Sequence, residues 1–222
     1  SQGCSEIEAI DVQLQLDRAT RTLTSPQTSR AIHLAPLLRG EHQIENAAVA
    51  AAVCLHARKA LPKLTIDTIE QGISSAEWPA RLELIDTPSG QVLIDAAHNP
   101  DCIESLSLYL DSLFAESKAT PNATALVFGS VADKDWAHML PMLLPRCSHR
   151  FFVEPGGRAP APIETMAKDF DGHACDSPRV ALSLARESVG AQGLVVVAGS
   201  IFLAGAARSV VLGVERDPAV GL

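Results

Sequence analysis

Continuous apolar runs and helix-spaced apolar residues alternate along the second half of the chain. The apolar runs predict strands at residues 92–95, 125–129, 150–153 and 194–198, with a further short strand considered at 173–175. The helical spacing predicts helices at residues 101–116, 135–144, 163–170, 179–189 and 201–211. Apolar strands separated by helices are typical of a sheet covered on both faces. We therefore expect an α/β fold with a Rossmann-like, mostly parallel sheet.

The first part of the chain has a different pattern. Short alternating runs predict small strands at residues 12–16, 21–24 and 31–34. An alanine-rich helix, apolar almost all round and therefore expected to be buried on most sides, is predicted at residues 44–61, and a second begins after Thr65 and stops within 72–75. Trp78 and Pro79 indicate a hinge, so we expect one domain at residues 1–77 and another at 78–222.

The sequence DAAHNP at residues 95–100 directly follows an apolar strand. Asn99 suits a helix N-cap and Pro100 the first helical position. The strand end and helix start would therefore hold Asp95 and His98 at the edge where open α/β sheets bind ligands. A capped turn with a solvated histidine explains these six residues equally well.

Composition and charge exclude several classes of protein. The 222 residues are 47% hydrophobic, enough for a packed core, and the net charge of −8 disfavours nucleic acid and anionic membranes as partners. No apolar stretch is long enough for a membrane span. The five cysteines are scattered without a CxxC pair, which favours a reducing cytoplasm, and the histidines show no metal-site spacing.

Further motifs appear in the order typical of one family. They are GEHQIENA at residues 40–47, WPARLE at 78–83, FGS at 128–130 with DKD at 133–135, and AGSIFL at 198–203. Together with DAAHNP, this ordered set resembles the Mur ligase superfamily, and the form of DAAHNP is most similar to the folylpolyglutamate synthase and dihydrofolate synthase branch. The resemblance spans roughly residues 33–208.

The resemblance implies an ATP-dependent amide ligase. Such an enzyme activates the γ-carboxylate of a folate as an acyl phosphate and joins it to L-glutamate, using ATP and Mg²⁺. The sequence has no G-x-x-x-x-G-K-[ST] motif. We therefore expect residues 1–77 to be the last part of a central ATPase domain, the Mg²⁺ ligands to lie outside this chain, and the chain alone to be inactive.

The resemblance also implies roles for individual residues. Asn46 matches the position that contacts adenine, with His42 and Gln43 as weaker candidates. Arg81 matches the arginine that holds the nucleotide, Asp95 is expected to accept from ribose hydroxyls, and His98 to donate to the nucleotide. Without the resemblance, helix capping and a buried amide bonded to the backbone are the ordinary explanations for the residues at 42–46. A surface arginine is the ordinary explanation for Arg81.

Lys134 matches the lysine that reaches the transferred phosphoryl group, where its charge stabilises developing negative charge. A surface lysine paired with Asp133 or Asp135 is the alternative. Ser200 either helps to hold glutamate or simply caps a helix. The proline-broken segment 155–162 is expected to be a flexible connection.

Ala80 and Ala96 stand where the family commonly has glycine. Glycine permits a positive φ that alanine resists, so each alanine raises the question of whether the backbone makes the same turn. Two other functions stay open: a Mur-type ligase for another substrate, and a non-catalytic module that binds a nucleotide or glutamate. The choice between folate and dihydropteroate also stays open, and exposed core surface makes self-association plausible.

Overall fold

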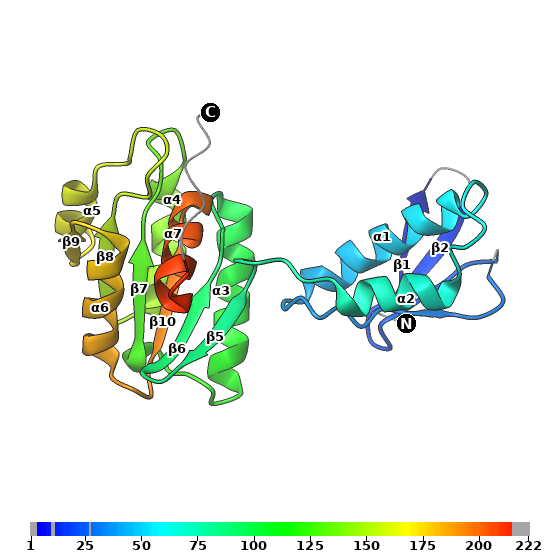
Figure 1. The fold of residues 1–222 in the computed structure, drawn as a ribbon, viewed down its shortest axis with the longest axis horizontal. Helices are drawn as coiled ribbons and strands as arrows, with labels where there is room; N and C mark the ends of the chain where they lie inside the picture. The colour runs from blue at the N-terminus through cyan, green and yellow to red at the C-terminus, as the bar shows by residue number, and fades with distance from the viewer. Residues whose placement is uncertain (1–3, 10–11, 27, 215–222) are drawn as a thin grey trace. The chain divides into compact units, whose positions relative to one another are not determined.

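The computed structural model describes residues 4–9, 12–26 and 28–214. It divides the chain into two compact units, residues 1–78 and 79–222 (Figure 1). The division falls after Trp78, one residue beyond the boundary expected from the sequence. Each unit has its own hydrophobic core, so we describe them separately.

The first unit is a small antiparallel sheet packed against two helices. The strands follow the order β1 (Cys4–Ala9), β2 (Val12–Asp17), β3 (Thr22–Thr24) and β4 (Ile32–His33). The helices are α1 (His42–Ala57) and α2 (Ile66–Ser75). Alternate strand side chains are buried against them, including Leu14, Leu16 and Leu23. The three predicted strands and both helices are confirmed, whereas β1 was not predicted.

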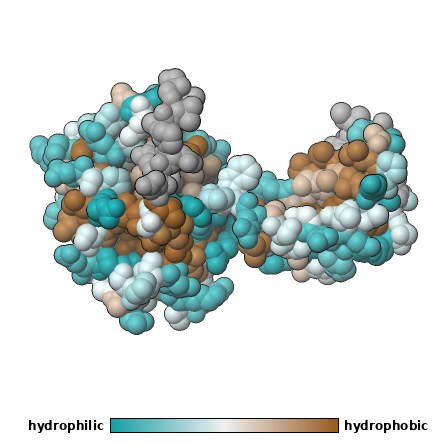
Figure 2. Space-filling model, in the orientation of Figure 1, coloured by the Kyte–Doolittle hydropathy of each residue, from teal (hydrophilic) through white to brown (hydrophobic). Residues whose placement is uncertain are grey.

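One side of α1 lacks the burial that its sequence predicts. Alanines and leucine on the other side pack in the core, but Val49 and Val53 are 53% and 63% exposed. Figure 2 shows hydrophobic residues at the surface of this unit over α1. A helix that is apolar on both sides is stable when both are covered. The described residues cover only one of them.

The second unit alternates strands and helices, as predicted. Its strands are β5 (Glu83–Thr87), β6 (Gly90–Ile94), β7 (Thr124–Phe128), β8 (His149–Val153), β9 (His173–Cys175) and β10 (Leu194–Ala198). Its α-helices are α3 (Pro100–Ala115), α4 (Trp136–Leu143), α5 (Ile163–Asp169), α6 (Pro178–Val189) and α7 (Ile201–Leu212). Short 3₁₀ helices lie at Pro121–Ala123 and Leu144–Arg146.

The sheet order is β5-β6-β10-β7-β8-β9, and every neighbouring pair is parallel except β5 with β6. Helices α3, α4 and α5 contribute to the core on one face, and α6 and α7 to the core on the other. The predicted Rossmann-like layout is therefore confirmed. Strand β5 was not predicted because its two acids and the following turn interrupt the apolar pattern of an edge strand.

Candidate functional site

The carboxyl ends of three neighbouring strands are joined by backbone hydrogen bonds. Gly129 N–H donates to Ala198 O at 3.3 Å, and Gly199 N–H donates to Ala97 O at 2.8 Å. Gly199 has a φ of +106°, and a Cβ there would lie 2.7 Å from Gly129 O. Only glycine fits this position. The turn after β6 and the segments after β7 and β10 thus share one edge of the sheet.

The Asp95 carboxylate fixes the turn that follows β6. Asp95 is 8% exposed, and its Oδ1 accepts a hydrogen bond from Ala97 N–H at 2.7 Å. Its Oδ2 accepts from Leu82 N–H, also at 2.7 Å. A carboxylate that accepts two backbone N–H groups holds both segments firmly. Asp95 therefore has a structural role that the sequence motif did not reveal.

Arg81 lies on a segment that is bonded to this same turn. Ala96 N–H donates to Ala80 O at 2.8 Å, and Asp95 holds the backbone of Leu82. Ala80 and Leu82 have φ values of +58° and +45°, so the backbone is left-handed on both sides of Arg81. The Arg81 side chain is exposed. The structure thus brings Arg81 beside the turn that carries Asp95 and His98.

Ala80 and Ala96, which stand where the family commonly has glycine, differ in backbone conformation. Ala80 adopts the left-handed conformation that glycine would favour, whereas Ala96 does not have a positive φ. Alanine in the left-handed region costs roughly 1–2 kcal/mol. The surrounding hydrogen bonds must therefore overcome this cost at Ala80.

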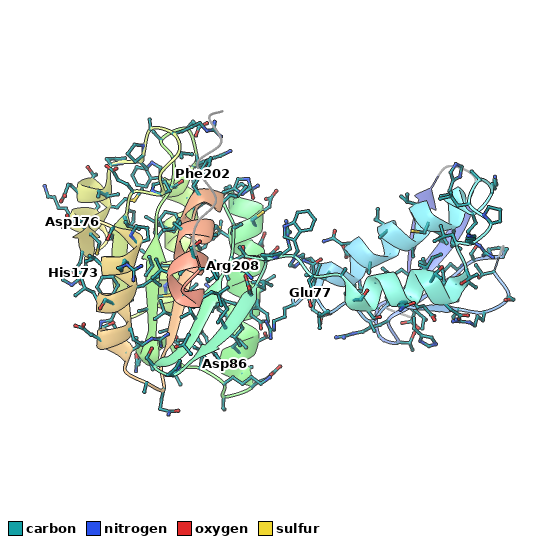
Figure 3. The ribbon with its side chains drawn as sticks, viewed as in Figure 1. Glu77, Asp86, His173, Asp176, Phe202 and Arg208 are labelled. Carbon is teal, nitrogen blue, oxygen red and sulfur yellow. The ribbon has the colours of Figure 1, made fainter. Side chains whose placement is uncertain are left out.

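Glu83 and Arg208 form a support for this segment that was not predicted. Glu83 Oε2 accepts from Ala80 N–H at 2.7 Å. Arg208 Nε, on α7, lies 3.0 and 2.9 Å from the two Glu83 carboxylate oxygens; Figure 3 labels Arg208. The partly buried pair ties β5 and the Ala80 backbone to α7. Glu83 ends the WPARLE motif, but its partner is 125 residues away in sequence.

His98 follows in the turn, and its ring is oriented by the backbone. Nδ1 lies 2.9 Å from Ala96 O, so it carries the proton and donates to this carbonyl. Nε2 of the neutral imidazole is then an acceptor, and it donates only when the ring is protonated. Asn99 caps α3 by accepting from Cys102 N–H at 2.9 Å, and Pro100 is the first helical residue, as predicted.

Lys134 lies in the segment between β7 and α4 and is partly buried. Both flanking acids have other partners: Asp133 pairs with Arg158 at 3.4 Å, and Asp135 with His138 at 2.8 Å. Within residues 14–214, apart from residue 27, the Lys134 ammonium has no ion pair. The structure therefore does not support the alternative in which Lys134 is paired with an adjacent acid.

The segment 155–162 was expected to be a flexible connection, and the structure shows an ordered one. Ala161 N–H donates to Ser130 O at 2.8 Å, and Ala132 N–H donates to Ala159 O at 2.9 Å. The segment after β8 is thus paired with the one after β7. Its prolines do not prevent this pairing because Ala159 and Ala161 supply the acceptor and the donor.

Ser200 is 3% exposed and caps α7, with Oγ accepting from Phe202 N–H at 3.1 Å. Capping was one of the two roles considered for this serine, and the structure confirms it. Its hydroxyl proton is still able to donate, so a contact with glutamate stays a prediction.

Asn46 lies in the first unit, exposed on the second turn of α1. Its Nδ2 donates to Gln43 Oε1 at 3.1 Å, and Gln43 Nε2 lies 3.0 Å from His42 Nε2. This leaves the Asn46 amide with an acceptor and a second N–H for a ligand. Asn46 and the edge of the second unit belong to separate bodies. Their convergence on one nucleotide stays a prediction.

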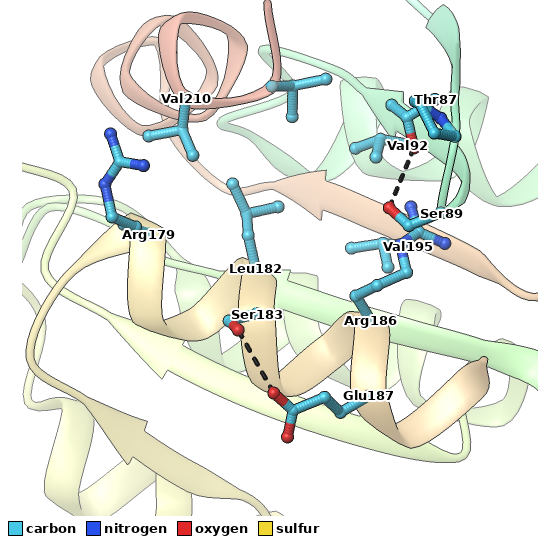
Figure 4. A pocket seen from close by; sticks show the side chains of 12 residues that line it. Thr87, Ser89, Val92, Arg179, Leu182, Ser183, Arg186, Glu187, Val195 and Val210 are labelled. Atoms are coloured by element: carbon cyan, nitrogen blue, oxygen red, sulfur yellow. Dashed lines mark hydrogen bonds between the residues drawn. The ribbon is translucent and has the colours of Figure 1, made fainter. Parts of the chain in front are cut away.

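A groove of about 580 Å³ lies elsewhere on the second unit, between α6, α7 and the β5–β6 turn (Figure 4). Leu182, Val195 and Val210 contribute apolar side chains to it, and Arg186 and Glu187 contribute charges. The Arg186 guanidinium donates to the carbonyl of Gln91 in β6 at 2.8 Å and to that of Gly193, just before β10, at 3.1 Å. None of the candidate residues lines this groove.

No helix in the described ranges is both long and apolar enough to cross a membrane. Within the same ranges, no three His, Cys, Asp or Glu side chains gather as a possible metal site.

The chain is similar to known folylpolyglutamate synthases. It is 35% identical to the folylpolyglutamate synthase of Lacticaseibacillus casei over 190 residues, which are 84% of this chain and 42% of that protein. A solved structure of folylpolyglutamate synthetase from Lactobacillus casei matches with a TM-score of 0.64 and 27% identity, over 94% of this chain and 45% of that one.

The fold is also that of Mycobacterium tuberculosis folylpolyglutamate synthase complexed with ADP, with a TM-score of 0.69 at 24% identity, over 97% of this chain and 48% of that one. The chain thus spans about half the length of the relatives it matches. Residues 80–201 match the family described as Mur ligase, glutamate ligase domain. The chain therefore belongs to the Mur ligase family and carries its glutamate ligase domain.

Proposed function

We propose that this chain is the C-terminal part of an ATP-dependent ligase that adds L-glutamate to a folate in the cytoplasm. The observation that supports this proposal is the position of the Arg81 segment. Its backbone is bonded to the Asp95 turn, so Arg81 lies beside the turn that carries Asp95 and His98, at the carboxyl edge of the sheet. That edge is the ligand-binding side of an open parallel sheet. The 35% identity to a folylpolyglutamate synthase supports the choice of reaction.

In this proposal ATP phosphorylates the γ-carboxylate of the folate, releasing ADP, and the glutamate amine then displaces phosphate from the acyl phosphate. Arg81 forms charge-assisted bonds to phosphate or ribose oxygens. Asp95 accepts a hydrogen bond from a ribose hydroxyl, and Nε2 of His98 offers an acceptor when neutral and a donor when protonated. Asn46 contacts the adenine edge. Lys134 stabilises the charge of the transferred phosphoryl group.

The Mg²⁺ that such a reaction uses would be held outside this chain. The missing P-loop is expected in the same remaining part of the ligase. The exposed Val49 and Val53 of α1 support an incomplete first unit, because a continuation of its domain would cover them.

The test compares this chain with the complete ligase encoded by its gene. We expect the complete enzyme to form ADP over repeated turnovers only when a folate and L-glutamate are both supplied, and to lengthen the folate by one glutamate. Mass spectrometry of the product and coupled detection of ADP measure both. We expect the purified chain alone to show neither activity.

Three results would contradict the proposal. Turnover by the chain alone, free of the complete enzyme, would contradict the interpretation of this chain as one part of a longer ligase. Addition of another amino acid, or to an acceptor other than folate or dihydropteroate, would assign the protein to a different Mur-type ligase. Nucleotide binding without any ligation would favour a non-catalytic module.

A further inference from the structure

The backbone on both sides of Arg81 is held in an unfavourable conformation. Ala80 and Leu82 have φ values of +58° and +45°, and a residue with a Cβ loses roughly 1–2 kcal/mol in the left-handed region. Such conformations persist only where the surrounding structure fixes them, and they are concentrated at functional sites. The contacts that fix this backbone therefore decide where the Arg81 side chain starts.

The segment around Arg81 is held from two sides. Through the hydrogen bonds described above, the turn that carries Asp95 holds the Ala80 carbonyl and the Leu82 N–H. The Ala80 N–H is held separately, because it donates to Glu83 Oε2 at 2.7 Å. Glu83 is the first residue of β5. The segment is thus held both by the turn after β6 and by the start of β5.

The Glu83 carboxylate is a fixed acceptor only when its own orientation is set. A glutamate side chain rotates about several bonds and loses conformational entropy when it is ordered. Arg208 orders it, because the Arg208 Nε lies 3.0 and 2.9 Å from the two carboxylate oxygens. The Arg208 and Glu83 side chains are only 33% and 23% exposed, so solvent screens the pair incompletely.

Arg208 transmits the rigidity of the core to this segment. It lies on α7, as Figure 3 shows, and α7 buries Leu203, Ala204 and Ala207 in the core on its face of the sheet. The Ala80 peptide is therefore connected through two side chains to a packed helix that is distant in sequence. A substitution at Arg208 would loosen the Ala80 N–H contact and leave the two bonds from the Asp95 turn in place.

We propose that Arg208 is a positioning residue for Arg81. Through the Glu83 carboxylate it holds the Ala80 peptide, and so it sets the position of the Arg81 backbone before the nucleotide binds. This inference rests on the ligase function proposed above, in which Arg81 binds phosphate or ribose oxygens. A guanidinium on a fixed segment loses less conformational entropy on binding than one on a mobile segment. Arg208 thereby strengthens nucleotide binding without contacting the nucleotide.

The test measures nucleotide binding by the complete ligase. We expect Arg208→Ala to raise the Kd for ADP, measured by calorimetry, and the KM for ATP by about fivefold to tenfold, since the lost preorganisation acts on nucleotide binding. The KM for L-glutamate should stay within about twofold, because Arg81 is assigned to the nucleotide. Arg208→Lys keeps the charge but not the planar guanidinium, so its values should fall between wild type and alanine.

A second background separates positioning from direct contact. In the Arg81→Ala enzyme, Arg208→Ala should cause no further rise in the Kd for ADP, because the side chain through which it acts is gone. Residues that act independently instead give additive effects.

Arg146→Ala is the matched control. Arg146 Nε donates to Asp111 Oδ1 at 2.8 Å, and the Arg146 side chain is 23% exposed, so this pair resembles the one between Arg208 and Glu83. It joins α3 to the 3₁₀ helix Leu144–Arg146, and α3 packs on the other face of the sheet. We expect Arg146→Ala to lower the thermal stability at least as much as Arg208→Ala and to leave the Kd for ADP unchanged.

Three results overturn the inference. An unchanged Kd for ADP in Arg208→Ala would show that Arg208 does not position Arg81. Equal rises in Arg208→Ala and Arg146→Ala would show that any loss of stability weakens nucleotide binding. A further rise in the Arg81→Ala background would show that Arg208 acts independently of Arg81. All three leave the proposed ligase intact. A wild-type enzyme that adds no glutamate would contradict the proposed function instead, and ADP binding would still test the role of Arg208.

Discussion

Asp95 holds Leu82 in place: the carboxylate Oδ2 accepts the Leu82 backbone N–H at 2.7 Å, across 13 residues of sequence. Its other oxygen holds Ala97 at the same distance. The residue expected to contact a ribose is thus also the support of the Arg81 segment. Loss of Asp95 would therefore change both folding stability and the position of Arg81.

We expect Asp95→Asn to destabilise the second unit by about 2 kcal/mol. The amide keeps one acceptor oxygen, but its NH2 group would face a buried backbone N–H that then has no acceptor. Urea unfolding of the chain measures this. Asp86→Asn is the matched control, since Asp86 is exposed and its one side-chain hydrogen bond within the described part of the chain is accepted from the Gln91 side chain. If the two variants lose the same stability, the Asp95 bonds contribute nothing specific.

We expect Ala80→Gly to stabilise the second unit by roughly 0.5–1 kcal/mol, because relief of the left-handed strain exceeds the extra freedom of glycine in the unfolded chain. The φ of +58° at Ala80 is the basis of this prediction. Ala96→Gly serves as the control and should destabilise by about 0.5–1 kcal/mol, since Ala96 carries no such strain. Thermal unfolding of both variants gives the comparison. A destabilised Ala80→Gly variant would mean that the turn is not strained.

Lys134→Ala concerns the complete ligase. We expect kcat to fall by about 100-fold or more with a much smaller change in apparent ATP affinity, because the lost charge acts mainly in the transition state. Stability should change little, as Lys134 has no ion pair among the described residues. Steady-state kinetics and thermal unfolding separate the two effects. A near-normal kcat would make Lys134 an ordinary loop residue.

Stability of the first unit should depend on pH through Glu70. Bonds from the Arg30 guanidinium, at 2.6 and 2.8 Å, lower the pKa of Glu70 from 4.5 to about 2, and His33 N–H adds a further bond. Because the folded pKa lies below the unfolded one, the stabilisation is complete above about pH 4.5 and is lost as the pH falls toward 2.

Glu70→Gln should remove this dependence and cost about 1 kcal/mol at pH 7, the scale of a partly exposed, solvent-screened pair. The free energy of unfolding measured between pH 2 and 7 is the readout. Glu77→Gln is the control, because Glu77 is exposed and has no ion pair among the described residues. A wild-type profile in Glu70→Gln would place the acid sensitivity elsewhere.

Much of the fold could be predicted because its signals are local. The apolar run before Asp95 and the capping pair Asn99 and Pro100 each depend on neighbouring residues, and the structure confirms both. Strand β5 escaped prediction because its edge position tolerates acids in place of an apolar run. The pairing of residues 155–162 also escaped, since a proline-rich sequence carries no signal of a partner elsewhere in the chain.

By itself, the sequence determined which elements form, that the sheet is mostly parallel, and which motif residues fall where strands end. Periodicity and capping act over a few residues, so they can be read along the chain. Only the tertiary structure decided which side chains hold one another: Asp95 with the backbone of Leu82, Glu83 with Arg208, and Asp133 with Arg158. Those contacts join segments 13 to 125 residues apart. They form only when packing of the helices on the sheet brings the strand ends to one edge.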